Sequence, residues 1–509
     1  MVKSRWQQLK PGIWGRDIDE CERFYHLSAR RDDGCYPITG CASFSTTSSS
    51  SVLTVGEDDG ERHRVEGALR NAWATLCYEH PTLRSRIEHD EHSGRCRRLY
   101  STFRSQDEKE SWLDTTFIVV DTKLHPSQWF NEESLSFGIS TLFLVRSRHP
   151  DKYHQSIFLR CPHDITDGIG ILQLVDQLVS YAARAYEQGV TYTAPTWGDE
   201  YSRLSPCLRV AATIPDSLSE AQTERFKEIQ TENLGTYTHP NLLGLPPSST
   251  TTSILQSRRQ RLAVVVPKVT SQQITRNSKA IAPGVSVTHV FMSALAIALS
   301  ELQPPKEESH TVRYVNHSMI NLRPYCSDSY STPEHAGAAY HTVSAQALGI
   351  DLVVPPLATC GVIEGNVDQL PRITTDVRDF FKRIRPISST DEQVTLAPLM
   401  FKSLTPSPGS DPHMTSSPPF CPVPLSSIGN VASVVSPRYG SFKIMDVWAS
   451  SEPIGAGVAV FLGTWDGEIQ LSGVFDTRYH DANYIHKFLE RIVNCVTRGL
   501  DINDYVAPK

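Results

Sequence analysis

The sequence predicts an α/β protein made of two units of similar size. Its 509 residues exceed the usual length of one domain, and hydrophobic (39%) and charged (21%) residues occur in proportions typical of globular proteins with packed cores. Helix-like and strand-like segments alternate in both halves of the chain. A polar stretch separates the halves, so we expect a first unit over residues 1–215, a crossover over 216–258 and a second unit over 259–509.

The first half contains two amphipathic segments with three strand-like segments between them. The segment 61–81 ends at a proline and carries apolar side chains at helical spacing: Val65, Leu69, Trp73 and Leu76. Runs rich in β-branched and aromatic residues predict strands at 116–120, 140–146 and 155–161. Residues 170–189 predict a second helix, which ends at Gly189.

The second half shows the same alternation of helices and strands. It begins with a strand at 261–267, a buried helix at 285–302 and a strand at 311–324. The C-terminal part adds strands at 429–435, 441–448, 457–463 and 468–474, and a helix at 482–500. Asp466 and Gly467 separate the last two strands and predict a tight β-hairpin. Residues 405–424 are rich in Pro and Ser and predict a mobile surface loop.

The composition argues against several classes of function. The net charge is -7 and no block of Lys and Arg stands out, so we expect no nucleic-acid partner. The longest apolar run, at 290–299, is too short to span a bilayer, and the N-terminal residues lack the apolar core of a secretory signal. The 11 cysteines include no C-x-x-C pair, which favours neither a metal site nor a disulfide framework. We therefore expect a cytoplasmic protein with reduced thiols and no bound metal.

One short stretch, His-Asp-Ile-Thr-Asp-Gly from His163 to Gly168, is the strongest candidate for chemistry. It follows the predicted strand 155–161 and precedes the predicted helix 170–189, so His163 lies on a strand-to-helix turn. Histidine has an ordinary pKa of about 6.5 and is the usual general base near neutral pH. Asp167 would hold the turn rather than the imidazole. The alternative is a loop histidine followed by an ordinary N-cap aspartate and a glycine that eases entry into the helix.

The motif resembles the His-x-x-x-Asp-Gly signature of the CoA-dependent acyltransferases of the BAHD and condensation-domain superfamily. Two further segments match in the same order. Residues 79–87 are similar to the His-Pro-x-Leu-Arg segment after the first long helix, and 319–325 to the strand that carries the arginine partner of the motif aspartate. Residues 436–448 depart from the Asp-Phe-Gly-Trp-Gly motif of the plant members, so the role of that motif is not carried over. Within the superfamily, the chain is most similar to the fungal trichothecene 15-O-acetyltransferases.

The resemblance implies two subdomains of the chloramphenicol-acetyltransferase type, with the active site in a tunnel between them. A monomer without a metal would move the acetyl group of acetyl-CoA to a hydroxyl of a sesquiterpenoid, the C-15 hydroxyl of a trichothecene. His163 would be the general base, Asp167 and Gly168 would shape the turn, and Arg323 would pair with Asp167. Three aromatic residues, which would otherwise be plain core residues, are expected to line an apolar acceptor pocket: Tyr340, Phe442 and Trp448.

The sequence gives less support to other mechanisms. No Gly-x-Ser-x-Gly elbow, phosphate-binding loop or His-Glu-x-x-His motif is present. Cys161 lies in phase with His163 and could act as a nucleophile, although a buried strand cysteine is the commoner case. A condensation-like protein that binds a carrier-bound acyl group, or joins it to an amine, would use the same histidine. We expect direct transfer without an acyl-enzyme, and a rate that falls at acid pH, with an apparent pKa of about 6–7 if the surroundings of His163 do not shift it strongly.

Overall fold

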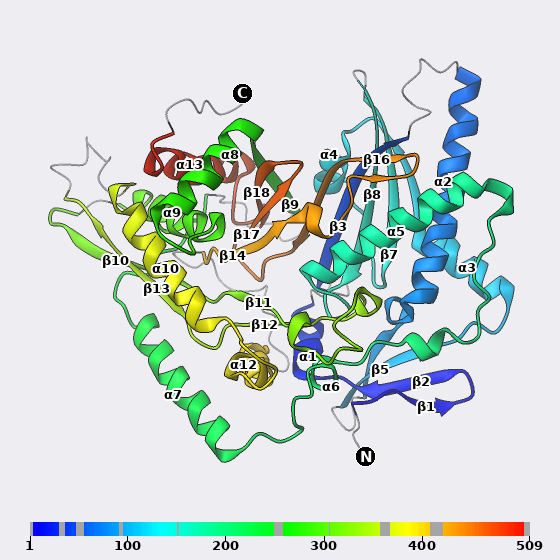
Figure 1. Cartoon of the computed structure of the whole chain (residues 1–509), viewed down its shortest axis with the longest axis horizontal. Helices are drawn as coiled ribbons and strands as arrows, with labels where there is room; N and C mark the ends of the chain where they lie inside the picture. Colours follow the sequence, from blue (N-terminus) through cyan, green and yellow to red (C-terminus); the bar gives the residue numbers. More distant parts are fainter. Residues whose placement is uncertain are drawn as a thin grey trace.

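The computed structural model describes residues 4–29, 36–46, 55–90, 95–149, 152–248, 258–304, 306–356, 367–407 and 421–502. These residues form two α/β halves that lie side by side, the first coloured blue to cyan and the second green to red (Figure 1). The mixed α/β class and the two-part layout predicted from the sequence are therefore confirmed. Most of the mobile loop predicted at 405–424 lies outside the described residues.

A six-stranded mixed sheet forms the centre of the first half. Its order is β15-β16-β3-β8-β7-β6, and every pair is antiparallel except β6 with β7. The strands predicted at 116–120, 140–146 and 155–161 correspond to β6, β7 and β8. The bounds are β3 Pro37–Thr46, β6 Phe117–Thr122, β7 Thr141–His149, β8 Lys152–Pro162, β15 Arg438–Tyr439 and β16 Phe442–Ser451.

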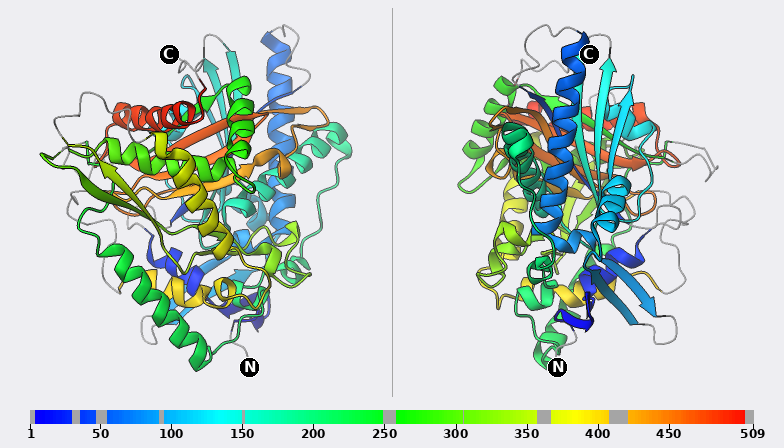
Figure 2. Two further views of the ribbon diagram at one scale, coloured as in Figure 1. Left: turned by 60° about the vertical axis from the view of Figure 1, so that its left-hand side comes forward. Right: turned by 90° about the vertical axis from the view of Figure 1, so that its right-hand side faces the viewer.

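Two long helices cover one face of this sheet. α2 (Val55–Glu79) and α5 (Gly168–Gln188) pack against each other, and Figure 2 shows α2 running along the strands. α5 lies so close to β3 that a Cβ atom on Gly40 would come within 2.9 Å of the side chains of Ile171 and Val175. Glycine at this position therefore permits the close approach of helix and sheet.

Shorter elements complete the first half. α4 (Pro126–Glu132) packs on the opposite face of the large sheet, α1 (Glu20–Leu27) lies near the second half, and α3 (Gln106–Thr116) contacts β6 and β7. A separate antiparallel sheet has the order β1-β2-β5-β4. Its strands are β1 Gln7–Lys10, β2 Ile13–Asp17, β4 Arg86–Asp90 and β5 Arg95–Ser101.

The second half is built on a four-stranded sheet of order β14-β17-β18-β9. The predicted hairpin is confirmed, because β17 and β18 pair on either side of Asp466 and Gly467, whose φ angles are 45° and 80°. Two short two-stranded sheets, β10 with β13 and β11 with β12, lie beside it. The bounds are β9 Arg259–Val266, β10 His310–Asn316, β11 Met319–Asn321, β12 His341–Val343, β13 Leu348–Val354, β14 Leu425–Asn430, β17 Ala459–Trp465 and β18 Glu468–Asp476.

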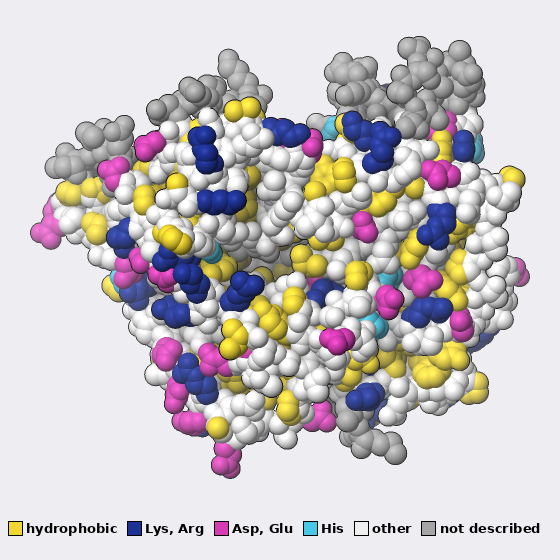
Figure 3. Space-filling view, viewed as in Figure 1, with side chains coloured by type: hydrophobic (Ala, Val, Ile, Leu, Met, Phe, Trp, Pro, Cys, Tyr) yellow, Lys and Arg dark blue, Asp and Glu magenta, His cyan; other side chains and the backbone are white. Residues whose placement is uncertain are grey.

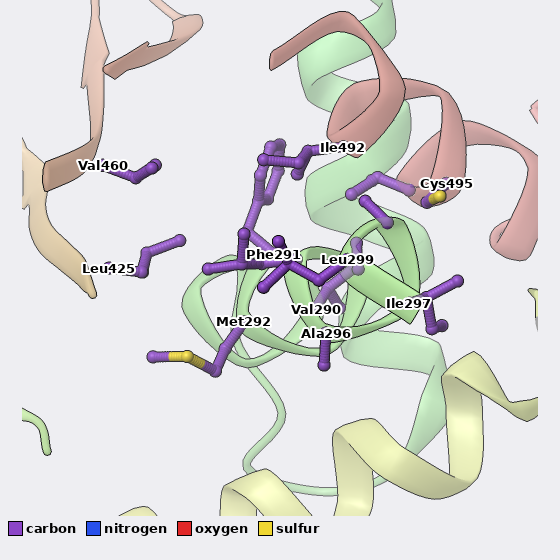
Figure 4. Close-up of a cluster of buried hydrophobic side chains, with 14 of the residues drawn as sticks. Val290, Phe291, Met292, Ala296, Ile297, Leu299, Leu425, Val460, Ile492 and Cys495 are labelled. Atoms are coloured by element: carbon purple, nitrogen blue, oxygen red, sulfur yellow. The ribbon is translucent and has the colours of Figure 1, made fainter. Parts of the chain in front are cut away.

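The core of the second half is centred on α9 (Val287–Glu301), the helix predicted to be buried. Every residue from Val290 to Ser300 is buried, so this helix has no solvent-facing side over three turns. Figure 4 shows its side chains packed against those of a C-terminal helix and of the sheet. The surrounding helices are α8 Lys268–Ile281, α10 Leu370–Ile384 and α13 Ala482–Gly499.

Two features differ from the simple two-unit prediction. β15 and β16 fall within residues 259–509, but β16 pairs with β3 and β15 pairs with β16, so the second half of the chain supplies two strands to the sheet of the first half. A strand pattern identifies a strand but not its partner, which is why the crossing is invisible in the sequence. The segment 216–258, expected as a polar crossover, contains the helix α7 (Glu220–Tyr237), which starts with a capping box at Ser219.

Membrane spans, metal-ligating groups and cysteines can be examined within the residues that the structure describes. No helix within it combines the length and the apolar character needed to cross a bilayer. It contains no group of three or more His, Cys, Asp or Glu side chains that could hold a metal ion. The nine cysteines within it are free and buried.

Candidate active site

The motif histidine lies on the turn between β8 and α5. The backbone N–H of His163 donates to the carbonyl of Tyr36, 2.6 Å away, which continues the pairing of β8 with β3 by one residue and fixes where the side chain leaves the strand. His163 is only 7% exposed. Its imidazole lies among three other rings, those of Tyr25 on α1, Tyr36 and His341 on β12. Residues from both halves therefore enclose the imidazole.

Asp167 holds the turn rather than the imidazole. Its side chain is the N-cap of α5 and accepts a hydrogen bond from the backbone N–H of Gly170 at 2.7 Å. The other carboxylate oxygen accepts from the guanidinium of Arg323 at 3.0 Å and from the backbone N–H of Tyr340 at 2.7 Å. Burial alone would raise the pKa of Asp167, but Arg323, His341 and the backbone donors lower it below its ordinary value. The carboxylate therefore stays charged and fully engaged in holding the turn.

Arg323 connects this turn to the second half of the chain. The ion pair with Asp167 predicted from the sequence is present, and both side chains are almost completely buried. The same guanidinium also donates to the carbonyl oxygens of His335 at 3.0 Å and Ala338 at 2.6 Å. A buried charge pair is stable only when the other hydrogen-bonding groups of its side chains also have partners. The carbonyls of His335 and Ala338 are such partners for Arg323.

A second buried charge network supports the motif from the first half. Asp164, the residue after His163, accepts hydrogen bonds from the guanidinium of Arg98 through both its side chain and its carbonyl. Arg98 is also paired with Glu22 on α1, and Glu22 in turn binds Arg16 at 2.6 Å. These arginines hold the pKa of Glu22 at about 2, against the effect of its burial. The turn is thus fixed from α1 as well as from the second half.

The glycine that the turn requires is Gly170, not Gly168. A Cβ atom on Gly170 would lie 2.5 Å from both the Ala336 carbonyl oxygen and the Arg323 guanidinium, and 2.4 Å from the Thr166 hydroxyl. A Cβ atom on Gly168 would meet nothing within 4 Å. The prediction that Gly168 shapes the site is therefore corrected: the second half of the chain packs directly against Gly170, two residues further along.

Burial is the main influence on the imidazole of His163. It lowers the pKa from the ordinary 6.5 to about 3, and His341 acts in the same direction, while Asp167 and backbone groups of the turn act against it. The apparent pKa of about 6–7 expected from the sequence does not hold for a ring in this environment. Nδ1 is fully buried without a hydrogen-bond partner among the described residues, which leaves Nε2 as the nitrogen that could meet a substrate. A neutral imidazole is the form that a general base needs.

Two hollows are candidates for substrate sites, and only the larger of them is lined by residues of both halves. The larger has a volume of about 510 Å³ and lies on the α4 side, at the ends of β3, β8, β9 and β16. Tyr36 lies between this hollow and the imidazole of His163. The residue after it, Pro37, lines the hollow, and the Tyr36 hydroxyl donates to the carbonyl of Glu452, which also lines the hollow. The smaller, about 280 Å³, lies at the start of α9 beside β11 and β14, on the face that Figure 3 shows hollowed between the halves. β11, whose Met319 lines this smaller hollow, pairs with β12, which begins at His341; the imidazole of His163 itself lines neither hollow.

Comparison with known proteins supports this architecture. A scan against protein-family models finds no match. The acetyltransferase pigO of Monascus ruber is 24% identical over 506 residues, covering 98% of this chain and 99% of its own. The O-acetyltransferase pigM of the same species is 22% identical and covers 98% and 87%. The solved trichothecene 15-O-acetyltransferase TRI3 of Fusarium sporotrichioides superposes with a TM-score of 0.76 at 14% identity over 98% of both chains.

Condensation domains share the same architecture. The condensation domain of the Monacolin K polyketide synthase MokA superposes with a TM-score of 0.57 at 13% identity, over 96% of this chain and 97% of its own. This chain has the condensation-domain acyltransferase fold. The fold implied by the motif resemblance is thereby confirmed, and this acyltransferase-type fold superposes better on the stand-alone TRI3 enzyme than on the MokA condensation domain.

The three predicted acceptor residues of this acyltransferase-type chain do not surround His163. Tyr340 precedes β12, is fully buried, and its hydroxyl donates to the carbonyl of Pro206 at 3.0 Å. Phe442 pairs with the far end of β3, opposite the end next to the motif, and belongs to the core of the first half. Trp448 lies on the α4 side of the sheet under the guanidinium of Arg261, 4.0 Å from its ring centroid. All three have packing roles in the described structure, the alternative that the sequence left open.

The residues that do surround the imidazole were not found by sequence reasoning. Tyr25 and His341 lie in segments without a recognisable motif, and they come together only through the packing of α1 against the second half. Cys161, the alternative nucleophile, is fully buried in the core of the first half, where burial raises the pKa of its thiol to about 12. A thiol in that state forms little thiolate at neutral pH.

Proposed function

We propose that this chain is a CoA-dependent O-acetyltransferase that moves the acetyl group of acetyl-CoA to a hydroxyl of a small molecule, with His163 as the general base. The observation that carries the proposal is the placement of His163: its imidazole is buried, kept neutral by that burial, and enclosed by rings from both halves on a turn that Asp167 and Arg323 hold. The likeness to acetyltransferases from end to end supports the same reaction.

The reaction needs no covalent enzyme intermediate. Nε2 of His163 takes the proton of the acceptor hydroxyl while the hydroxyl oxygen bonds to the carbonyl carbon of the thioester. The tetrahedral intermediate then breaks its C–S bond, and the departing thiolate takes the proton from the imidazolium, which leaves the ester, free CoA and a neutral histidine. The negative charge that develops on oxygen raises the proton affinity of the imidazole during the reaction, which offsets its low resting pKa.

The two hollows suit the two substrates differently. The CoA moiety carries phosphates, and the smaller hollow lies at the start of α9, where Arg378 and Lys382 on α10 face the residues just before the helix. These two cations share the carboxylate of Asp379, which leaves one net positive charge beside the helix N-terminus, and that combination favours phosphate. The larger hollow shows no such excess of positive charge, because three glutamates and three arginines line it: Glu132, Glu133, Glu452, Arg160, Arg258 and Arg259. We therefore place CoA on the α9 side and the acceptor on the α4 side.

For the acceptor, we propose a rigid polycyclic alcohol, with the C-15 hydroxyl of a trichothecene as the first to be tested. Support comes from the superposition on TRI3, which is a trichothecene 15-O-acetyltransferase. A volume of about 510 Å³ is within the usual range for sites that enclose molecules of this size. The aromatic rings beside the imidazole also suit an acceptor with few hydroxyl groups.

The test is release of CoA thiol from acetyl-CoA in the presence of a panel of alcohols, with the ester product identified by mass spectrometry. Acceptor-dependent thiol release by the wild-type chain, lost in His163→Ala, is the expected result. Lys382→Glu should raise the KM for acetyl-CoA and leave the KM for the alcohol unchanged, whereas Glu133→Lys should have no such effect on the CoA side. No ester with any alcohol would contradict the proposal.

A second candidate is condensation chemistry, favoured by the superposition on the MokA condensation domain. In that case an acyl group would be delivered on a carrier protein, and the same histidine would serve an amine or a carrier-bound acceptor. Acyl transfer from a carrier-bound thioester, with none from acetyl-CoA, would favour this candidate over the first.

A further inference from the structure

Tyr25 covers one face of the proposed base. Its ring stacks on the imidazole of His163 with centroids 3.9 Å apart and planes within 7° of parallel. Tyr25 is 5% exposed, so this contact is closed to solvent. A flat ring at this distance excludes water from one face of the imidazole and leaves no room for the imidazole to turn about its own axis. The plane of the imidazole is thus set by Tyr25.

His341 holds Tyr25 in place. The Tyr25 hydroxyl and Nε2 of His341 lie 2.7 Å apart. Burial raises the pKa of Tyr25 well above 10, so the hydroxyl keeps its proton, and burial lowers the pKa of His341, so its imidazole is neutral. With both groups neutral, one of them donates to the other, and the tautomer of His341 decides which.

The three rings come from separate parts of the fold. Tyr25 is on α1, His163 follows β8, and His341 begins β12 in the second half. Phe401 closes the group from behind, with ring centroids 6.3 Å from Tyr25 and 5.7 Å from His341. The arrangement is therefore assembled only when the two halves pack together.

We propose that Tyr25 and His341 form a clamp that positions the imidazole of His163 for proton transfer, a role that rests on the acyltransferase function proposed above. Tyr25 is the positioning residue that touches the imidazole, and His341 acts through Tyr25. A base works only when its lone pair points at the proton that it takes, at hydrogen-bond distance. By fixing the plane of the ring and excluding water, the clamp keeps Nε2 in that direction and the ring in its neutral form.

The charges around His163 make this effect measurable. The titratable groups that face it come from α1, the residue before β3, β12 and the turn into α5: Tyr25, Tyr36, His341 and Asp167. Of these, Asp167 carries the charge, since its pKa is lowered, and it is paired with Arg323. Loosening the clamp therefore acts on the His163 pKa chiefly by admitting water, which raises it.

The first experiment compares Tyr25→Leu, which removes the flat ring, with Tyr25→Phe, which removes only the hydroxyl. In histidine-labelled protein followed by NMR, with the His163 signal identified by its absence in His163→Ala, we expect the His163 pKa to rise toward 6.5 in Tyr25→Leu and to stay low in Tyr25→Phe. We expect kcat to fall about 10–100-fold in Tyr25→Leu with the KM for acetyl-CoA nearly unchanged, and at most about tenfold in Tyr25→Phe. An unchanged His163 pKa in Tyr25→Leu would overturn the clamp.

The second experiment asks whether His341 acts through Tyr25. His341→Leu breaks the same hydrogen bond as Tyr25→Phe, so the double variant should lose no more kcat than the worse single variant. His341→Gln, which can still accept from the hydroxyl, should recover part of the loss. Tyr192→Phe is the matched control, because it removes a tyrosine hydroxyl 2.6 Å from Thr75 and away from the site. Losses that multiply in the double variant would show independent roles and overturn the proposal.

The NMR titration also separates this proposal from the proposed function. It requires folded protein but no turnover, and thermal unfolding of each variant shows whether the fold is retained. A His163 pKa that rises in Tyr25→Leu supports the clamp even if the wild-type chain transfers no acetyl group. Acetyl transfer by the wild type together with an unchanged pKa in Tyr25→Leu would leave the function standing and reject the clamp.

Discussion

Asp167 and Arg323 are 156 positions apart in the chain, yet an Asp167 carboxylate oxygen lies 3.0 Å from a guanidinium nitrogen of Arg323. The pair joins the turn that carries His163 to the segment between β11 and β12 of the second half. Because both side chains are almost fully buried, solvent does not weaken the attraction between them. The position of the imidazole therefore depends on how the two halves pack, because the pair ties its turn directly to the second half.

Removing this link should cost stability as well as activity. Asp167→Asn keeps an N-cap side chain but leaves the Arg323 charge without its counter-ion, and breaking a buried pair typically costs about 3–5 kcal/mol. We expect a lower midpoint of thermal unfolding and a fall in kcat together. Asp376→Asn is the matched control, since its partner Arg372 is exposed and such pairs contribute at most about 1 kcal/mol. Equal effects of the two variants would contradict a structural role for the buried pair.

The two glycines of the motif offer a test that depends only on packing. Gly170→Ala would place a methyl group 2.5 Å from the carbonyl oxygen of Ala336, so the second half must shift, and overpacking of this kind costs about 1–3 kcal/mol. Gly168→Ala adds the same methyl group where nothing lies within 4 Å, at the first position of α5. We expect Gly170→Ala to lower the unfolding midpoint and the acetyl-transfer rate, and Gly168→Ala to leave both unchanged or slightly higher. The reverse order would show that the close contact is absent in solution.

The sequence predicts the parts of this site that depend on local pattern. A strand, a turn with His163 and Asp167, and a helix can be recognised because β and helical periodicities differ on either side of the motif. The resemblance was enough to select Arg323 as the partner of Asp167, although Arg323 begins a 3-10 helix (Arg323–Tyr325) and does not have the extended backbone that Pro324 favours. The hairpin at Asp466 and Gly467 was equally visible, because its turn demands positive φ angles.

The sequence does not predict the parts of the site that depend on contacts between distant segments. Tyr25 and His341 become neighbours of His163 only when α1 and β12 meet, and neither segment has a pattern that records this meeting. Phe442 and Trp448 looked like candidates for the acceptor pocket because they lie on strands of the second half. Since β16 joins the sheet of the first half, however, both point into packed layers of that sheet. The partner of an edge strand is chosen by tertiary packing, which a single sequence does not specify.

Loss of the base should remove most of the activity without unfolding the protein. His163→Ala deletes a ring whose Nδ1 has no hydrogen-bond partner, so little structural hydrogen bonding is lost with it. We expect kcat to fall by about 10²–10⁴-fold and the circular dichroism spectrum to stay unchanged. His89→Ala, on the exposed part of β4, is the matched control and should keep the wild-type rate. More than about a tenth of the wild-type rate in His163→Ala would exclude His163 as the general base.

The pH dependence should reflect the burial of His163. Because its pKa is lowered to about 3, the imidazole is neutral at every pH above that value, and kcat/KM should not fall between pH 7.5 and about 5 on its account. In the unfolded chain, His163 binds a proton below about pH 6.5, whereas in the folded chain it does so only near pH 3. The free energy of unfolding therefore falls as pH is lowered from 6.5 toward 3. Rates should be measured at temperatures where circular dichroism shows the fold intact. If kcat/KM of the folded enzyme falls at acid pH with an apparent pKa near 6.5, then water reaches the His163 imidazole in solution.

The order of chemical steps gives the last prediction. If the acceptor and the thioester enter from the two hollows and meet at Nε2 of His163, both must be bound before any bond breaks. Initial-rate plots should then show intersecting lines, whereas a covalent route would give parallel lines. Cys161 is the nucleophile to exclude: its thiol is fully buried, with its pKa raised to about 12, so Cys161→Ala should keep most of the activity. Intact-protein mass spectrometry after mixing with acetyl-CoA alone should show no added acetyl group. An acetyl adduct on Cys161 that forms as fast as the overall reaction would replace direct transfer with a two-step route.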